Sequence, residues 1–127
     1  FGPLKQLDAS PVAKQESSGA KAELKVADFL TQNGHRIIAR NYKTKYYEID
    51  IISTKDQTIY FTEVKYRKSS YRGTPLEMIT REKQNQMTFA ATAFLKSHPK
   101  FNKMNPTLAA AAVSGSDFQI TDWFTIN

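Results

Sequence analysis

Two short stretches of the sequence place charged side chains inside segments that otherwise consist mostly of hydrophobic residues. Glu48 and Asp50 lie two residues apart in one segment, and Glu63 and Lys65 lie two residues apart in the next. Because side chains alternate between the two faces of a strand, each pair shares one face. If the two segments form a hairpin, Asp50 and Glu63 come to neighbouring strands at one end of a sheet, with Lys65 beside them.

A pair of carboxylates beside a lysine suits the metal-assisted hydrolysis of a phosphodiester bond. Carboxylate oxygens are preferred ligands of Mg²⁺ and Mn²⁺, which retain several waters for a substrate phosphate. Such a metal lowers the pKa of its bound water, so hydrolysis needs no covalent nucleophile. The side chain of Lys65 can orient the attacking water, or deprotonate it when the amine is neutral, and its charged form can offset the negative charge of the transition state.

The same residues allow a simpler interpretation. Glu63 and Lys65 would then lie at an exposed strand end, where water solvates both and neither has a chemical role. One such pair would usually be explained in this way. The presence of Asp50 about one hairpin earlier in the chain favours the site over the exposed strand end.

A helix is expected at residues 19–33, with Ser18 as its N-cap and Asn33-Gly34 as its end. At about 100° per residue, Glu23 falls on the hydrophobic stripe of this helix. That stripe is predicted to contain Ala20, Leu24, Ala27 and Leu30. A carboxylate facing a sheet is costly unless it meets a cation, a metal or hydrogen-bond donors, so Glu23 is a candidate third acid that could join the metal cluster directly or through water. Alternatively, Glu23 lies at the edge of the stripe and reaches solvent.

The remaining chain alternates between segments rich in β-branched and aromatic residues and short polar turns. The first three such segments predict an antiparallel meander, and the third is expected to be a central strand because both of its faces begin with hydrophobic residues. A second helix is expected at residues 80–97. The expected strands are residues 35–42, 46–53, 58–66, 107–113 and 118–126. The order α-β-β-β-α-β-β predicts an α/β fold with a mixed β-sheet of about five strands flanked by helices.

Length and composition restrict the class of protein. A chain of 127 residues allows one domain, which we expect at residues 19–127, preceded by a flexible arm at residues 1–18. The chain has no cysteine, which excludes disulfides, thiolate zinc sites and a cysteine nucleophile, and no run of apolar residues is long enough to cross a membrane. We therefore expect a cytoplasmic location. The net charge of +6 is compatible with a polyanionic partner.

Several motifs resemble a known group of nucleases. Asp50 followed by Glu63-x-Lys65 resembles the signature of the PD-(D/E)xK, or restriction-endonuclease-like, superfamily. More closely, the chain resembles the YraN family, small bacterial proteins similar to archaeal Holliday-junction resolvases. The matching stretches are Gly19-Ala20-Lys21-Ala22-Glu23 with Ala27, GHRIIARNY at residues 34–42, EIDII at residues 48–52, FTEVKYR at residues 61–67, and residues 80–87 around Lys83.

This resemblance implies a restriction-endonuclease-like core and a set of site residues. It implies metal ligation by Asp50 and Glu63, with Mg²⁺ or Mn²⁺ as the cofactor, catalytic assistance from Lys65, and a supporting acid at Glu23. Lys83 would lie on the buried side of the second helix and face the active edge of the sheet; alternatively, its long stem simply reaches solvent. The chain departs from the family pattern at Ala22 and Tyr47, where glycine is usual, and at residues 106–109, which lack the family's late Arg-Phe-Asp stretch.

Basic and aromatic residues alternate near the proposed site, which favours a nucleic acid as the substrate. Basic groups can contact phosphates, and aromatic rings can stack on unpaired bases. The candidate basic residues are Lys43, Lys45, Arg67, Lys68, Arg72 and Lys83. Branched or partly single-stranded DNA is the preferred substrate, as in repair or recombination, ahead of RNA and with no membrane partner. Tyrosines are also common in strands for packing reasons alone.

Two other functions remain open from the sequence. The first is a nucleic-acid-binding module that keeps the fold without appreciable turnover. The second is a toxin-type nuclease domain that acts on tRNA. If the substrate is a DNA junction, two strands must be cut, which implies a homodimer.

Overall fold

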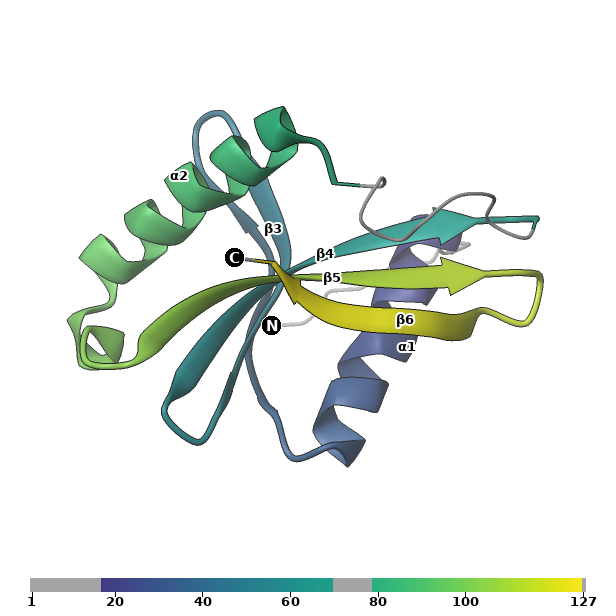
Figure 1. Ribbon diagram of the computed structural model, residues 1–127, viewed down its shortest axis with the longest axis horizontal. Helices are drawn as coiled ribbons and strands as arrows, with labels where there is room; N and C mark the ends of the chain where they lie inside the picture. The colour runs from purple at the N-terminus through teal and green to yellow at the C-terminus, as the bar shows by residue number, and fades with distance from the viewer. Residues whose placement is uncertain (1–16, 70–78, 127) are drawn as a thin grey trace, which may run out of the picture.

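The computed structural model describes residues 17–69 and 79–126, which form a five-stranded sheet with one helix on each face (Figure 1). Its elements are α1 (Ser18–Gln32), β2 (Arg36–Lys43), β3 (Glu48–Lys55), β4 (Thr58–Arg67), α2 (Arg81–Ser97), a short 3₁₀ helix η2 (Pro99–Phe101), β5 (Asn105–Ser114) and β6 (Gln119–Ile126). The mixed α/β fold and the order α-β-β-β-α-β-β are therefore confirmed. Most of the expected arm at residues 1–18 lies outside the described residues. No helix in the described ranges is long and apolar enough to cross a membrane.

The sheet has the strand order β2-β3-β4-β5-β6, so β4 is the central strand, as predicted. β2, β3 and β4 form the expected antiparallel meander. β5 then runs parallel to β4, because α2 carries the chain back to the other end of the sheet, and β6 returns antiparallel to β5. The carboxyl ends of β2 and β4 and the amino end of β3 consequently meet at the same end of the sheet.

The two helices cover opposite faces of the sheet and produce two separate cores. Alternate residues of β5 separate the cores: Ala110 packs in the core under α2, whereas Ala111 packs in the core under α1. The α2 core includes Ile52, Ile59, Phe61, Met87 and Phe94. The α1 core includes Ala22, Val26, Leu30, Ile51 and Val113. These buried faces fix the position of both helices relative to β4.

The predicted start and orientation of α1 were wrong in two details. Ser17, not Ser18, is the N-cap, and its hydroxyl accepts a hydrogen bond from the backbone N–H of Ala20 at 3.1 Å. The helix packs through Ala22, Val26, Ala27 and Leu30, whereas Leu24 is 38% exposed. Two residues correspond to about 200° around a helix, so a stripe that contains Val26 leaves Leu24 on the far side.

The β3–β4 ladder ends early, and this break shapes the site. Its last pair is Ile51↔Thr62, after which no further pair joins the two strands, and β3 and β4 diverge (Figure 1). The predicted strict alternation of β3 was also wrong, because Ile49 packs in the α2 core while Ile51 packs in the α1 core. We call the opening between the two strands beyond this last pair the β3–β4 fork.

Candidate active site

Asp50 lies in the β3–β4 fork, where its carboxylate replaces part of the missing ladder. Its Oδ2 accepts a hydrogen bond from the backbone N–H of Val64 at 2.8 Å. An unpaired buried N–H group is costly, so this contact gives the Val64 N–H a partner at the point where β3 and β4 separate. Asp50 and Glu63 thereby come to the same fork, as the sequence predicted.

The surroundings of the Asp50 carboxyl group disfavour its charged form. Burial raises its pKa from 3.8 to about 7, with a further increase from the negative charge of Glu63 and smaller increases from Glu23 and Glu48. The hydrogen bond from Val64 opposes these effects by favouring the charged form. Perturbed carboxyl groups with a like-charged neighbour are typical of sites that bind a cation or transfer protons.

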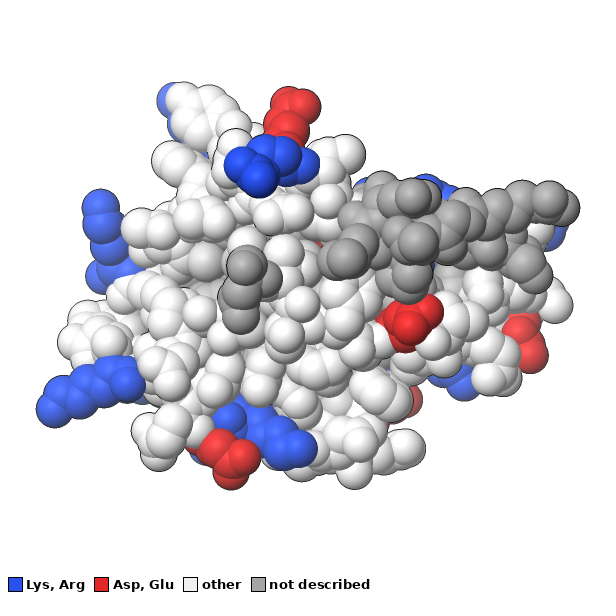
Figure 2. Space-filling model, in the orientation of Figure 1, with Lys and Arg blue, Asp and Glu red and all other residues white. Residues whose placement is uncertain are grey.

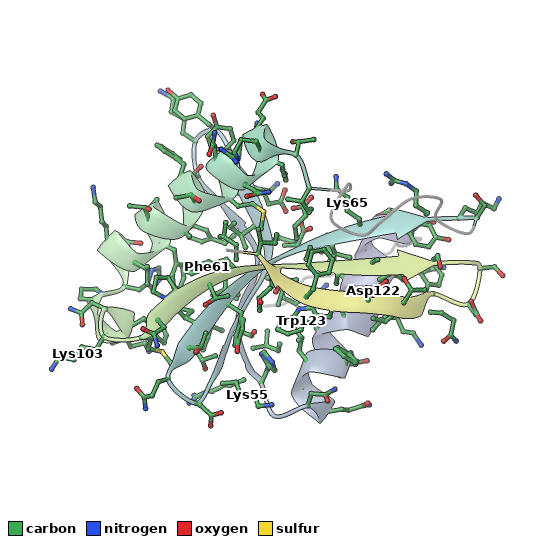
Figure 3. The ribbon with its side chains drawn as sticks, in the orientation of Figure 1. Lys55, Phe61, Lys65, Lys103, Asp122 and Trp123 are labelled. Atoms are coloured by element: carbon green, nitrogen blue, oxygen red, sulfur yellow. The ribbon has the colours of Figure 1, made fainter. Side chains whose placement is uncertain are left out.

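Glu63 is buried on β4, and two lysines approach its two oxygens. Only 7% of the residue is exposed. Lys65 Nζ lies 3.5 Å from Oε2, and Lys83 Nζ lies 3.6 Å from Oε1. Lys65 lies on β4 near the start of α2 (Figure 3), from which Lys83 points back to the sheet. The Thr80 hydroxyl fixes this first turn of α2 by accepting a hydrogen bond from the Lys83 N–H at 3.0 Å.

Lys83 was predicted to lie on the buried side of the second helix and face the sheet, and its ammonium group contacts Glu63 on β4. Its ammonium group is therefore directed to a carboxylate rather than to open solvent. The side chain of Lys83 is still 30% exposed, and that of Lys65 is 32% exposed. Both lysines consequently remain accessible to an anionic group that approaches Glu63.

Glu23 lies at the edge of this site and belongs to a separate hydrogen-bond network. The amide of Asn41 donates to Glu23 Oε1 at 2.8 Å and to Glu48 Oε2 at 3.0 Å. Arg40 lies 3.9 Å from the same oxygen of Glu23. Glu23 and Glu48 influence Asp50 through their charge, while Asn41 holds both in place.

Sequence reasoning missed Asn41 as a site residue. Asn41 adopts a left-handed conformation with φ of 53° and lies between the ladder pairs Arg40↔Ile51 and Tyr42↔Ile49. Asparagine is depleted in strands but tolerates positive φ better than most residues. An asparagine inside the segment RIIARNYK was therefore a usable signal that β2 is irregular opposite Asp50.

The donor set at the fork is compatible with a hard divalent cation. In the two described ranges no three His, Asp or Glu side chains converge into a ready metal site. Asp50 and Glu63 would be the two protein ligands, with water and substrate phosphate as the others, which is a usual arrangement for Mg²⁺. A cation there would also relieve the repulsion that raises the pKa of Asp50.

The residues paired with Glu63 and Lys65 on β5 have small side chains, which leaves room for a substrate. In the parallel ladder Glu63 pairs with Ala110 and Lys65 pairs with Ala112, so small side chains flank both residues. A hollow of about 280 Å³ lies beside Lys65 and is lined by Lys65, Thr80, Glu82, Lys83 and Gln86. A phosphate group can therefore approach both lysines from this side.

The remaining basic candidates lie around the same end of the sheet. Lys43 ends β2 and Arg67 ends β4, and both are exposed, as are Lys45 and Lys68. Arg72 lies outside the described residues. Figure 2 shows Lys and Arg side chains at several separate places on one face of the molecule rather than as one continuous patch. Positive charge alone therefore does not mark a binding surface on that face.

The fold and the paired acidic strands are those of a restriction-endonuclease-like core. The chain belongs to the uncharacterised protein family UPF0102, the YraN family, whose model matches residues 22–114. It is 44% identical over 81 residues to a UPF0102 protein of Chlorobium phaeobacteroides (strain BS1), a match that covers 64% of each chain. It is 32% identical over 117 residues to a UPF0102 protein of Saccharophagus degradans, covering 91% of this chain and 99% of the relative. A third relative, from Vibrio parahaemolyticus, is 34% identical over 98 residues, covering 77% and 81%.

Proposed function

We propose that the protein is a metal-dependent nuclease that hydrolyses phosphodiester bonds in DNA. The observation that carries this proposal is the β3–β4 fork, where Asp50 and Glu63 repel each other and two lysines approach Glu63. A stable fold gains little from such an arrangement, whereas a site for a divalent cation and a phosphate requires it.

Each residue of the fork has a distinct role in this proposal. Asp50 and Glu63 would hold Mg²⁺ or Mn²⁺, which would supply Lewis-acid activation of the phosphate and of a water molecule. Lys65 lies next to Glu63 and orients the attacking water, whose proton it could accept only as a neutral amine. Lys83 contacts the phosphate and offsets the charge that develops on its oxygens in the transition state. Glu23 supports the site from α1 through Asn41.

Branched or partly single-stranded DNA is the proposed substrate class. The exposed basic residues Lys43, Lys45, Arg67 and Lys68 lie around the end of the sheet that carries the fork, where they can contact phosphates on both sides of the cleaved bond. Cleavage of both strands of a junction would need two active sites and hence a homodimer. Because DNA is the proposed substrate, we also propose a cytoplasmic location.

The test is a cleavage assay with labelled junction, flap, single-stranded and duplex DNA and with tRNA. Each substrate is incubated with the protein in Mg²⁺, in Mn²⁺ and in EDTA. The variants are Asp50→Ala and Lys65→Ala, with Lys55→Ala as a matched control because Lys55 lies at the opposite end of β3. We expect cleavage of branched DNA that requires the metal and disappears in both site variants.

Several outcomes would contradict this function. Tight binding of DNA without cleavage in any metal would identify a binding module, and preferential cleavage of tRNA would identify a toxin-type nuclease. Circular dichroism of each variant shows whether it is folded. Loss of folding in Asp50→Ala would mean that the carboxylate is structural.

A further inference from the structure

An exposed aromatic cluster lies at the β2–β3 turn, beside the end of the sheet that carries the fork. Within the described ranges, the large hydrophobic residues that remain exposed are Leu24 and two members of this cluster, Tyr46 at 66% and Phe89 at 50%. Tyr47 connects the two members. Its ring centroid lies 6.2 Å from that of Tyr46 and 5.5 Å from that of Phe89, edge-on to the latter. We call Tyr46, Tyr47 and Phe89 the aromatic platform.

The turn that presents this platform is rigid. The hydroxyl of Thr44 accepts hydrogen bonds from the backbone N–H groups of Tyr46 at 3.2 Å and of Tyr47 at 2.9 Å. The N–H of Thr44 in turn donates to the carbonyl of Tyr47 at 2.7 Å. Tyr47 also packs against the α2 core. A ligand that stacks on these rings therefore does not need to order the turn first, which lowers the entropic cost of binding.

Positive charge accompanies the platform. Lys45 Nζ lies 5.5 Å from the ring centroid of Tyr46, and Lys43 is exposed at the end of β2. Exposed aromatic rings interleaved with lysines match the chemistry of an unpaired nucleic-acid strand, whose bases stack while its phosphates meet the cations. A second protein chain would instead favour an apolar patch with few lysines.

The helix α2 carries residues of both the platform and the fork. Glu82 and Gln86 line the hollow beside Lys65. Phe89 follows Gln86 at i+3 and Glu82 at i+7, so all three share one side of the helix. Lys83, which contacts Glu63, precedes Phe89 by six residues, which is about 9 Å along the helix axis and about 120° around it.

We propose that the aromatic platform binds unpaired bases of the same strand whose phosphate is held at the β3–β4 fork. The proposal rests on the proposed nuclease function and adds to it the feature that the site recognises. A single-stranded segment next to the cleaved bond would be selected because duplex DNA hides its base faces from Tyr46 and Phe89.

The test measures binding rather than cleavage, so it is independent of catalysis. Fluorescence anisotropy in EDTA gives the Kd for a labelled 12-nucleotide single strand, for a duplex of the same sequence and for an abasic strand of the same length. The variants are Tyr46→Ala and Phe89→Ala, with Tyr46→Phe and Phe89→Tyr as ring-retaining controls. Leu24→Ala is the matched control because Leu24 is exposed on the opposite helix.

We expect each alanine variant to raise the Kd for the single strand about tenfold. The Kd values for the duplex and the abasic strand should change less than about twofold, because neither offers a free base face. The ring-retaining variants and Leu24→Ala should bind like the wild type. This pattern would support the platform even if no metal produced cleavage, in which case only the nuclease proposal fails.

Three results would overturn the platform. An equal loss of affinity for the abasic strand would mean that the residues act without base stacking. A change from dimer to monomer in Tyr46→Ala or Phe89→Ala, measured by analytical ultracentrifugation with unchanged single-strand affinity, would mean that the cluster joins two copies of the chain. Cleavage that requires Asp50 but is indifferent to both alanine variants would leave the nuclease function intact without the platform.

Discussion

The β3–β4 fork and a cluster around His35 both place polar side chains inside the same sheet, but they balance charge in opposite ways. His35 is only 8% exposed, and its Nδ1 lies 2.9 Å from the hydroxyl of Ser53. The rings of Tyr60 and Trp123 lie 4.9 and 5.5 Å away, and Trp123 extends toward the side of α1 (Figure 3). We call these four residues the His35 cluster.

Burial, and then the charge of Lys55, lowers the pKa of His35, so this imidazole is neutral at pH 7. In the His35 cluster, therefore, a neutral imidazole is paired with the neutral hydroxyl of Ser53. At the fork, by contrast, burial and Glu63 raise the pKa of Asp50, and like charges face each other. The comparison teaches that a buried polar group stabilises the fold where its partner is neutral and marks a ligand site where its neighbour carries the same charge.

The sharpest test of this comparison is one substitution in each region. We expect Asp50→Asn to lower the rate of metal-dependent DNA cleavage by about 10³-fold, because an amide cannot replace a charged metal ligand. His35→Asn should leave the rate per folded molecule within about twofold of the wild type. Single-turnover cleavage at 20 °C, with the folded fraction taken from circular dichroism, measures both. A comparable loss of rate in the two variants would contradict the division of roles.

The pH dependence of stability gives the next largest effect. Since folding raises the pKa of Asp50 from 3.8 to about 7, the folded state binds more protons than the unfolded state between these values. The free energy of unfolding therefore decreases as pH rises through this window, by up to about 4 kcal/mol, and changes no further above it. Urea unfolding in EDTA at pH 4, 5.5, 7 and 8 measures the slope.

The variant Asp50→Asn is the control for this slope, because its amide oxygen can still accept from Val64 but does not titrate. The difference in unfolding free energy between variant and wild type should grow from pH 4 to pH 7 in favour of the variant. An equal slope in both proteins would show that other groups cause the pH dependence.

Substitutions in the His35 cluster should change only the stability of the fold, and by less than the pH effect expected at Asp50. His35→Ala is expected to reduce the free energy of unfolding by about 2 to 3 kcal/mol, because it leaves a cavity between Tyr60 and Trp123 and removes the partner of Ser53. Urea unfolding at pH 7 measures the change. Ser53→Ala, which keeps the aromatic contacts, should cost less, and a cost below about 0.5 kcal/mol for His35→Ala would contradict the structural role of the cluster.

Asn41 provides the smallest and most specific test, because it supplies neutral donors to the acidic region. Asn41→Gly should be about 1 kcal/mol more stable than Asn41→Ala, since glycine adopts the observed φ of 53° without strain. Both variants lose the bonds to Glu23 and Glu48, so both should show the same modest decrease in cleavage rate. Unequal rates would mean that backbone geometry, not the amide, matters for the site.

Much of this architecture could be predicted from the sequence because its signals are local. Alternating hydrophobic residues, short polar turns and a proline after the second helix identified the order of elements and the meander. The convergence of Asp50 and Glu63 followed from the same hairpin, because pairing geometry brings the ends of adjacent strands together.

Other features depended on contacts that no local pattern encodes. The orientation of α1 is set by the close approach of Ala22 and Val26 to the sheet, not by the number of apolar residues on each side. The early end of the β3–β4 ladder puts Ile49 and Ile51 in different cores, which strict alternation excludes. Phe89 was not recognised as a surface residue, because its meeting with Tyr47 depends on how α2 crosses the sheet.

The two neighbours of β4 reach it by routes of very different length. β3 joins it across a tight turn that pairs Lys55 with Thr58, whereas β5 arrives only after α2 has formed and returned. Short loops close at the lower entropic cost, so the hairpin is expected to nucleate the sheet. Asp50 and Glu63 thus come together before Lys83 on α2 can reach them. Cations in solution that screen the repulsion between the two carboxylates should therefore accelerate refolding.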